Sequence, residues 1–403
     1  MHGITRRTCK DDTLKPWGHV WPLVIVLILA AAAHSATFER YQPHDIIIYV
    51  SHWYDRVAHF GFAAFEKPFS NYTPPYLYFL WVASLAFGPA SVPKIIIIIK
   101  LIAVSGSIWL SYALFHLFKS LAVSRSFFAA LAGLLLPSVI LNVSVLGQAD
   151  MFWVTPCILA MTAAIEGRLV GVAFWSGVAF AFKAQAIFFA PFVMYLFIIE
   201  RVPRWYWLIP ALVYCAAMLP AWLAGWDWWY LVNVYFRQAA WQPEDRIFVS
   251  NSGSWWTIFG YFFPDAAIRV FSLGYLLAAV GVLGYLRLPP SKCPRMLLLT
   301  ATLSATGLPF LLPGMHERFF ILGDVLAFGL AVVMKSRSAI IAAVLIQIGS
   351  ALPVATWAYD IRKAEIVAPF FMLGGLLILI EMMKEMGGQE NETTDRLAPL
   401  ANA

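Results

Sequence analysis

The sequence predicts an all-α polytopic membrane protein with about twelve transmembrane helices, because it holds that many apolar runs near the bilayer-spanning length of about 20 residues. Hydrophobic residues make up 61% of the chain and charged residues only 12%. A soluble domain has about a quarter of its residues charged. The mean hydropathy is +0.74, and Lys and Arg fall between the apolar runs, which is the pattern of membrane spans joined by basic connections.

The chain opens with a predicted cytoplasmic segment, 1–16, and its first apolar run imitates a secretory signal. Four basic residues precede the apolar core, and Ala33-His34-Ser35 resembles a cleavage site. We interpret this run as an uncleaved first span, because many further runs follow it. The apolar runs are 17–37, 94–117, 126–145, 149–165, 169–184, 186–200, 204–224, 267–287, 296–313, 318–334, 337–357 and 366–384.

The segment 75–90 is apolar enough to be mistaken for another span, and the basic residues decide its place. If 75–90 lies in the membrane interface, the basic residues at the span ends all fall on the cytoplasmic side, as the positive-inside rule requires. These residues are Lys119, Arg125, Arg168, Arg201, Arg204, Arg287, Lys292, Arg295, Lys335 and Arg337. We therefore expect an interfacial helix at 75–90, inside a long first outer loop, 38–93.

The same topology gathers the polar clusters of the chain on the outer face. A second long outer loop, 225–266, is also expected to hold an interfacial helix. Acids and cations that converge on one face of a membrane protein predict an active site or a polar binding cavity there. The remaining parts are C-terminal transmembrane helices at 336–386 and a disordered cytoplasmic tail at 387–403. The short outer turns are 147–150, 183–185, 313–318 and 359–363.

Two other classes of protein are excluded by the distribution of charge and cysteine. The net charge is +6, but a nucleic-acid-binding protein would concentrate its Lys and Arg in a patch or stripe. The cysteines have no metal-ligand spacing, so we expect neither a disulfide nor a zinc site. They are Cys9, Cys157, Cys215 and Cys293.

Three motifs follow one another on the predicted outer face. The first is Asp45, Tyr49, Trp53 and Gly61, then Tyr72-Thr73-Pro74-Pro75-Tyr76; the second is Gly147-Gln148-Ala149-Asp150 with Lys183-Ala184-Gln185; the third is Met315-His316-Glu317-Arg318-Phe319-Phe320. In this order they resemble the GT-C superfamily of membrane glycosyltransferases, in the branch of bacterial members related to mannosyltransferases. Thr73 is an extra residue before the prolines, and Ala184 stands where relatives often carry Pro. The resemblance covers residues 20–335 and implies a GT-C-like transmembrane catalytic module over 17–335.

The resemblance implies an inverting transfer of a hexose from a polyprenyl-phosphate sugar, with Asp45 as the general base. Such a transfer needs one base for the acceptor proton and a stabilised leaving group. Asp is also favoured as a helix N-cap, so capping of the helix that follows is the alternative role for Asp45. Asp55 is the competing acid, but Arg56 beside it predicts a solvated ion pair.

The other matched residues divide into phosphate contacts and sugar or acceptor contacts. Arg318, His316 and Lys183 are expected at the donor phosphate, because Arg grips phosphate bidentately and Lys acts as a point charge. The alternatives are an interfacial Arg and a structural His. The candidates for sugar or acceptor binding are Gln148, Asp150, Glu317, Tyr72 and Trp53. Asp150 could instead cap the span that follows it.

The partners implied are a polyprenyl-phosphate-linked sugar donor, a glycan or lipid-linked acceptor and the membrane lipid, with no nucleic acid. No Asp-x-Asp pair or His cluster demands a metal, although a divalent metal is compatible with the family. The expected place is the cell inner membrane, with the active site facing the periplasm. The alternative function is a multi-span transporter or flippase of a lipid-linked sugar, against which stand the two long outer loops and the lack of matched halves.

Overall fold

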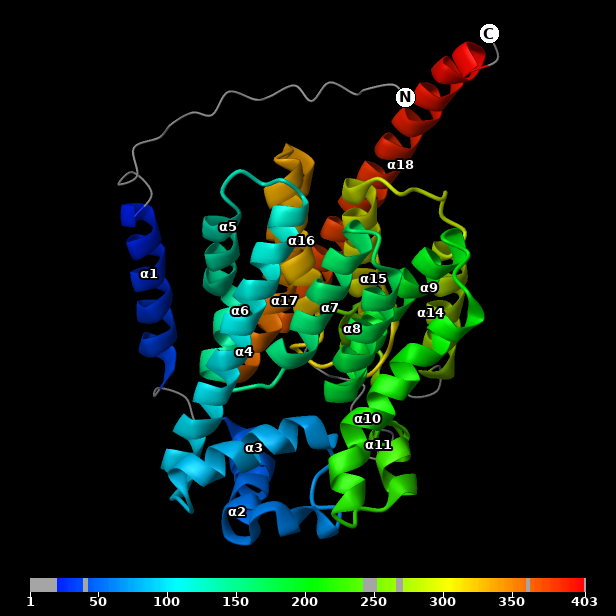
Figure 1. The fold of residues 1–403 in the computed structure, drawn as a ribbon. Helices are drawn as coiled ribbons and strands as arrows, with labels where there is room; N and C mark the ends of the chain where they lie inside the picture. The colour runs from blue at the N-terminus through cyan, green and yellow to red at the C-terminus, as the bar shows by residue number, and fades with distance from the viewer. Residues whose placement is uncertain (1–19, 39–42, 242–251, 266–270, 360–362, 402–403) are drawn as a thin grey trace.

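A computed structural model describes residues 20–38, 43–241, 252–265, 271–359 and 363–401, and this part of the chain is all-helical, without a strand (Figure 1). The prediction of an all-α protein is therefore confirmed for the described residues. The predicted cytoplasmic segment 1–16 lies outside them, as does part of each of the turns or loops 225–266 and 359–363.

Four helical segments are long and apolar enough to cross a membrane, or five if one bent pair counts as a single span. The four are α4 (Val92–Ser120), Arg204–Leu223, which joins η7 (Arg204–Leu208) to α10 (Ile209–Leu223), α17 (Arg337–Tyr359) and Ala364–Gly388, which joins η10 (Ala364–Val367) to the start of α18 (Ala368–Ala401). The bent pair is Ser126–Leu135 with Pro137–Val145, at 55°. The predicted count of about twelve spans is thus not reached by single long helices in the described chain.

Many of the other apolar helices are short because polar turns end them early. The helix α7 (Met151–Ile165) begins directly after Asp150, and α8 (Leu169–Phe182) ends directly before Lys183. The helix α16 (Ile321–Met334) begins three residues after Arg318. A helix rises about 1.5 Å per residue, so each of these covers only part of a hydrocarbon core about 30 Å thick.

The helices form a bundle with a separate layer at one end (Figure 1). Within the bundle α7 packs against α4 and α8, and α16 packs against α15 and α17. The layer at the lower end holds α2, η3, α3 and α11, and α18 projects beyond the upper end. The elements not yet given are α1 (Val20–Phe38), η2 (Ile46–Val50), α2 (Ser51–Phe60), η3 (Gly61–Glu66), α3 (Pro74–Phe87), α5 (Ser126–Ala132), η4 (Gly133–Leu135), α6 (Pro137–Ile140), η5 (Leu141–Val145), η6 (Ala184–Phe189), α9 (Ala190–Ile199), α11 (Trp228–Trp241), α12 (Trp255–Phe262), α14 (Phe271–Tyr285) and α15 (Pro294–Leu311).

The helix α3 is the one predicted at 75–90. It starts at two prolines, which suit the first turn of a helix, and ends at Gly88, whose φ is +62°. Its 14 residues are fewer than a span needs, and it packs against α2 in the lower layer. A separate helix at this place is confirmed, and its interfacial position stays a prediction. The layer is tied to the bundle by a hydrogen bond of 3.1 Å from the Thr73 hydroxyl to the Phe182 carbonyl.

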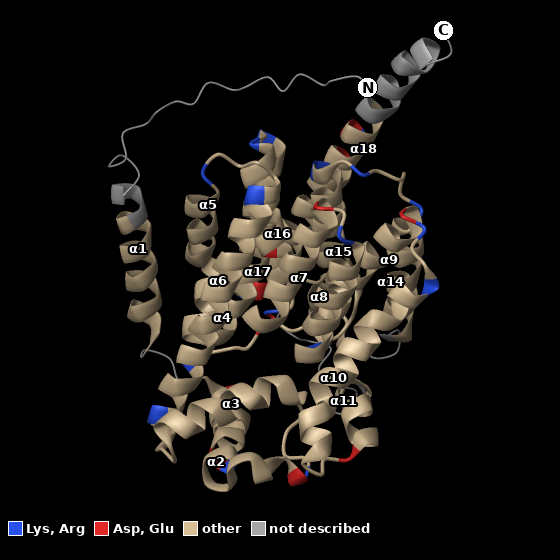
Figure 2. Ribbon diagram, viewed as in Figure 1, with Lys and Arg blue, Asp and Glu red and all other residues tan. Residues whose placement is uncertain are grey.

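Basic residues gather at the end of the bundle opposite this layer. Figure 2 shows Lys and Arg along the upper connections, including those between α4 and α5 and between α16 and α17. This distribution agrees with the prediction that the basic connections share one side. The tail predicted as disordered begins at 387, but α18 instead continues through this segment as far as Ala401.

Candidate functional site

Four polar segments, far apart in the sequence, meet where the bundle joins the lower layer. Asp45 lies one residue before η2, and Gly147 to Asp150 form the turn before α7. Lys183 is an extended residue between α8 and η6, with φ −159° and ψ 141°. The turn 316–318 precedes α16. Every one of the nine residues predicted for the site lies in the contact network that these segments form.

Arg318 is the centre of this network. Its Nη1 lies 2.6 Å from Glu317 Oε1, its Nη2 lies 3.4 Å from Asp45 Oδ2, and its Nε lies 3.9 Å from Asp150 Oδ2. The side chain is only 13% exposed. Burial disfavours the charged guanidinium, but the carboxylates of Glu317 and Asp45 beside it stabilise the charge. The guanidinium therefore stays charged and joins three acids from three segments.

Asp150 and Lys183 form a buried ion pair behind Arg318. Lys183 Nζ donates to Asp150 Oδ1 at 2.5 Å, and the two side chains are 8% and 1% exposed. Asn142 Nδ2 and Trp153 Nε1 also donate to the carboxylate, at 2.7 and 2.9 Å. Burial alone would disfavour the charged carboxylate of Asp150, but the positive charges of Lys183 and Arg318 beside it stabilise that charge. Asp150 makes no capping hydrogen bond to α7, so its predicted alternative role as a cap is wrong.

Asp45 is the accessible acid of the three. Its side chain is 35% exposed, compared with 1% for Asp150 and 6% for Glu317. Gln148 Nε2 donates to Asp45 Oδ2 at 3.2 Å. Asp45 has helical φ and ψ and makes no side-chain cap, so the capping alternative is wrong here too. The carboxylate is therefore held by side chains of the site and remains open to a ligand.

His316 lies at the edge of the network. Its Nδ1 is 3.8 Å from Glu317 Oε2, and its ring packs edge-on against Phe319 with centroids 5.1 Å apart. Burial lowers the pKa of His316 more than the neighbouring carboxylate of Glu317 raises it. The imidazole is thus neutral near pH 7 and can either donate or accept a hydrogen bond.

Tyr72 and Trp53 extend the site into the lower layer. Lys183 Nζ lies 5.4 Å from the centroid of the Tyr72 ring, and the Tyr72 and Trp53 centroids are 5.1 Å apart. Trp53 also lines a hollow of about 460 Å³ whose walls include Asn71 and Arg237. Aromatic faces beside amide and guanidinium groups suit contact with sugar rings.

Sequence reasoning missed Asn142 and Trp153, which complete the shell around Asp150. Asn142 is a lone amide in an apolar run, and Trp153 lies three residues after Asp150, on the same face of the helix. The ion pair predicted for Asp55 forms with His59 and not with the neighbouring Arg56. Asp55 Oδ1 lies 3.3 Å from His59 Nδ1, and both side chains are exposed, so Asp55 lies outside the site as predicted.

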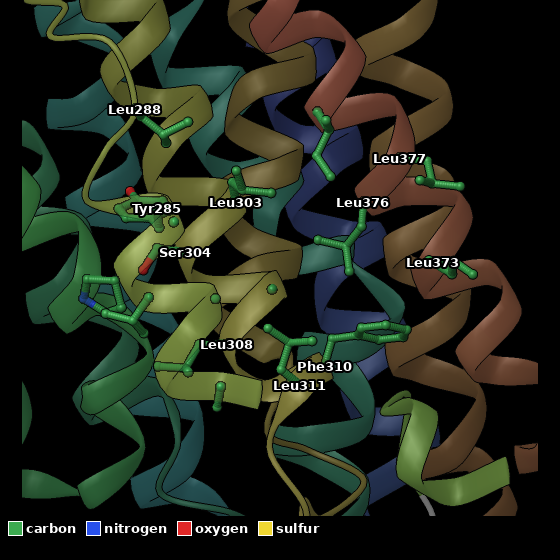
Figure 3. A pocket seen from close by; sticks show the side chains of 17 residues that line it. Tyr285, Leu288, Leu303, Ser304, Leu308, Phe310, Leu311, Leu373, Leu376 and Leu377 are labelled. Carbon is green, nitrogen blue, oxygen red and sulfur yellow. The ribbon is translucent and has the colours of Figure 1, made fainter. Parts of the chain in front are cut away.

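A separate apolar cavity of about 340 Å³ lies between α14, α15 and α18. Figure 3 shows Leu303, Leu308 and Leu376 around it, with Phe310 and Leu311 at the end where α15 stops. From there the chain runs to the site turn at 316–318. The ring of Phe188, whose carbonyl accepts from Ser304 on the cavity wall, lies 6.0 Å from that of Phe319.

The site offers no ready metal centre in the described part of the chain. No group of three His, Cys, Asp or Glu side chains there is arranged to hold a metal ion. Asp150 is bonded to Lys183, and Glu317 to Arg318. These residues do not fit a metal, because their carboxylates are already paired with cations.

The fold and the site define an all-helical protein with membrane-length helices and a buried network of charges at one end of its bundle. Comparison with models of known protein families and with curated proteins finds no match for the chain. The resemblance to the GT-C superfamily therefore rests on the three motifs alone.

Proposed function

We propose that the chain is an inverting glycosyltransferase of the GT-C superfamily, which moves a hexose from a polyprenyl-phosphate sugar to a glycan or lipid-linked acceptor. The site would face the periplasm of a bacterial inner membrane, because Lys and Arg gather at the opposite end of the bundle. The proposal keeps about twelve crossings, several of which would combine a short helix with the polar turn beside it.

One observation carries the proposal: an accessible carboxylate, Asp45, lies 3.4 Å from a buried arginine that two further acids hold in place. A general base must be reachable by the acceptor hydroxyl, and Asp150 and Glu317 are too buried for that role. A cation that stabilises a leaving phosphate must lie close to the base without having all its hydrogen-bond donors engaged by the base. Arg318 meets this condition through its separate contacts.

The proposed step transfers one proton and forms one glycosidic bond. The acceptor oxygen attacks the anomeric carbon while Asp45 takes the hydroxyl proton, and the bond from that carbon to the phosphate oxygen breaks. Its electron pair leaves with the phosphate, which goes from one negative charge to two. Asp45 loses its own charge at the same time, so Arg318 can shift from Asp45 to the phosphate with no change in total charge.

The remaining residues position these groups. Gln148 orients the Asp45 carboxylate, and the pair of Asp150 and Lys183 fixes Arg318 from behind. Lys183 is therefore assigned mainly to positioning, and His316, as a neutral donor, to the phosphate or the Glu317 carboxylate. Tyr72 and Trp53 would face the sugar.

The apolar cavity beside α15 is assigned to the polyprenyl chain of the donor. Its walls are almost wholly hydrocarbon, and they extend to Leu311 at the end of α15, seven residues before Arg318. A chain lying there would bring its phosphate toward the site turn. A donor chain already dissolved in the bilayer gains little from the hydrophobic effect here, so van der Waals packing against the cavity wall would hold it.

The test is turnover of a panel of radiolabelled polyprenyl-phosphate hexoses by the purified protein in nanodiscs, with the lipid products separated. The proposal predicts that one donor is converted to polyprenyl phosphate. Movement of an intact donor across a vesicle membrane, without cleavage of any member of the panel, would instead support the transporter alternative.

A further inference from the structure

A second buried polar cluster lies inside the bundle, apart from the site. It is formed by Asp324 on α16, Ser138 on α6, and Gln347 and Ser350 on α17. The helix α6 packs against both α16 and α17. These side chains come from three helices whose other buried residues are almost all apolar.

Asp324 is the one carboxylic acid of this cluster, and no counter-ion lies beside it in the described part of the chain. The residue is 2% exposed, and neither carboxylate oxygen has a hydrogen-bond partner. The hydroxyls of Ser350 and Ser138 face the carboxylate. None of the ion pairs formed within the described chain includes Asp324. A buried carboxylate without compensation is costly, so Asp324 must take up either a proton or a cation.

The chain is broken beside this cluster. Leu136 is extended, with ψ 126°, and the axes before and after it differ by 55°. Pro137 has no N–H, so the helix cannot satisfy every carbonyl of its preceding turn. Broken helices inside membrane bundles supply carbonyl oxygens to monovalent cations for this reason.

We propose that Asp324, Ser138, Ser350 and the Oε1 of Gln347 bind a monovalent cation of the size of Na⁺. Ser138 already donates to that Gln347 oxygen at 3.3 Å, which brings the oxygens of both side chains to one place. All the ligands are hard oxygens, which suit an alkali ion. One carboxylate neutralises one positive charge, whereas a divalent ion would leave a net charge buried in the bundle.

The cation would join the two segments that carry the active-site motifs. The turn at 316–318 leads directly into α16, and η5 leads into the turn 147–150. A cation held between α16 and the broken helix would fix the spacing of Arg318 and Asp150. The inference does not depend on the proposed reaction, because it concerns cation binding alone.

The experiment measures thermal unfolding of the detergent-solubilised full chain during titration with NaCl, KCl or LiCl, with N-methyl-D-glucamine chloride keeping the ionic strength constant. Na⁺ should raise the Tm of the wild type by mass action on the folded state. Asp324→Asn should abolish the response. Ser350→Ala should raise the Na⁺ concentration at the midpoint of the Tm response by about tenfold.

Ser107→Ala is the matched control, because Ser107 is equally buried but bonds only to the Val104 carbonyl of its own helix. Its response to Na⁺ should equal that of the wild type. A wild type that responds to no alkali cation would show that Asp324 holds a proton instead and would overturn the proposal. An Asp324→Asn protein that responds like the wild type would also overturn it, and if that variant does not fold, Ser350→Ala decides.

Discussion

Replacing Asp150 by Asn tests whether the buried ion pair holds the site together. Asn keeps the shape of the side chain, and its single oxygen can still accept from Trp153, so the substitution removes the charge and the acceptor that faces Asn142. Lys183 would then be left 8% exposed with its partner, 2.5 Å away, neutralised. Breaking a buried pair in this way costs about 3–5 kcal/mol. We expect Asp150→Asn to lower the Tm of the solubilised protein clearly and to abolish turnover.

Two further variants make this prediction specific. Adding Lys183→Met to Asp150→Asn removes the stranded charge and should recover part of the lost stability. Lys292→Met breaks the pair with Glu200, in which the lysine is 71% exposed, and should change stability by less than about 1 kcal/mol. The measurement is thermal unfolding followed by size-exclusion chromatography. Equal Tm values for Asp150→Asn and Lys292→Met would refute the reasoning.

Three further predictions concern the turn before α7, the protonation of the site and the apolar cavity. Gly147→Ala and Gly88→Ala both place a Cβ at φ +62°, but only at Gly147 would it meet another side chain, at 2.6 Å from Ile46 Cδ1. Thermal unfolding should show a loss of stability of about 1–2 kcal/mol for Gly88→Ala and a larger loss for Gly147→Ala. Equal losses would contradict the packing at Gly147. Burial lowers the pKa of His316 below its usual 6.5, so near that pH the unfolded chain binds a proton that the folded chain does not. The Tm should therefore fall as pH drops through about 6.5, and it should fall less steeply in His316→Gln. Parallel curves of Tm against pH would show that His316 does not cause the pH dependence. Leu376→Trp should fill part of the cavity and raise the KM for long-chain donors, while the KM for a short-chain water-soluble analogue stays unchanged. An equal rise in both KM values would show that the polyprenyl chain does not bind in this cavity.

The sequence was enough to predict that the candidate residues lie close together, because each motif lies at the end of an apolar run. Helix ends on one side of a membrane meet at one level, so the charge rule brought Asp45, Asp150, Lys183 and Arg318 to one face. It could not predict which cation pairs with which acid. The pair of Asp150 and Lys183 depends on the rotation of α7 and α8 about their axes, which apolar runs without a polar face do not fix.

Helix lengths and the second cluster were also beyond the sequence. In the sequence, the apolar runs around 147–150 and 183 look like nearly continuous spans. In the structure, the helices end at the polar turns there, and the charged side chains of these turns pair with one another. Asp324 is a single acid in an apolar run, and only the packing of α6 and α17 reveals the hydroxyls beside it. The role of Asp45 could not be decided either, because a cap and a base use the same residue at the same helix end.

The most direct test of the account is the initial rate of donor cleavage by Asp45→Asn compared with Asp55→Asn, at matched expression and saturating donor. Asp55 is the matched control, since the substitution is the same and the residue lies ten positions further on, exposed and paired only with His59. Removal of a general base lowers kcat by about 10²- to 10⁴-fold. The account predicts such a loss for Asp45→Asn and a wild-type rate for Asp55→Asn. Turnover by Asp45→Asn at the wild-type rate would contradict it.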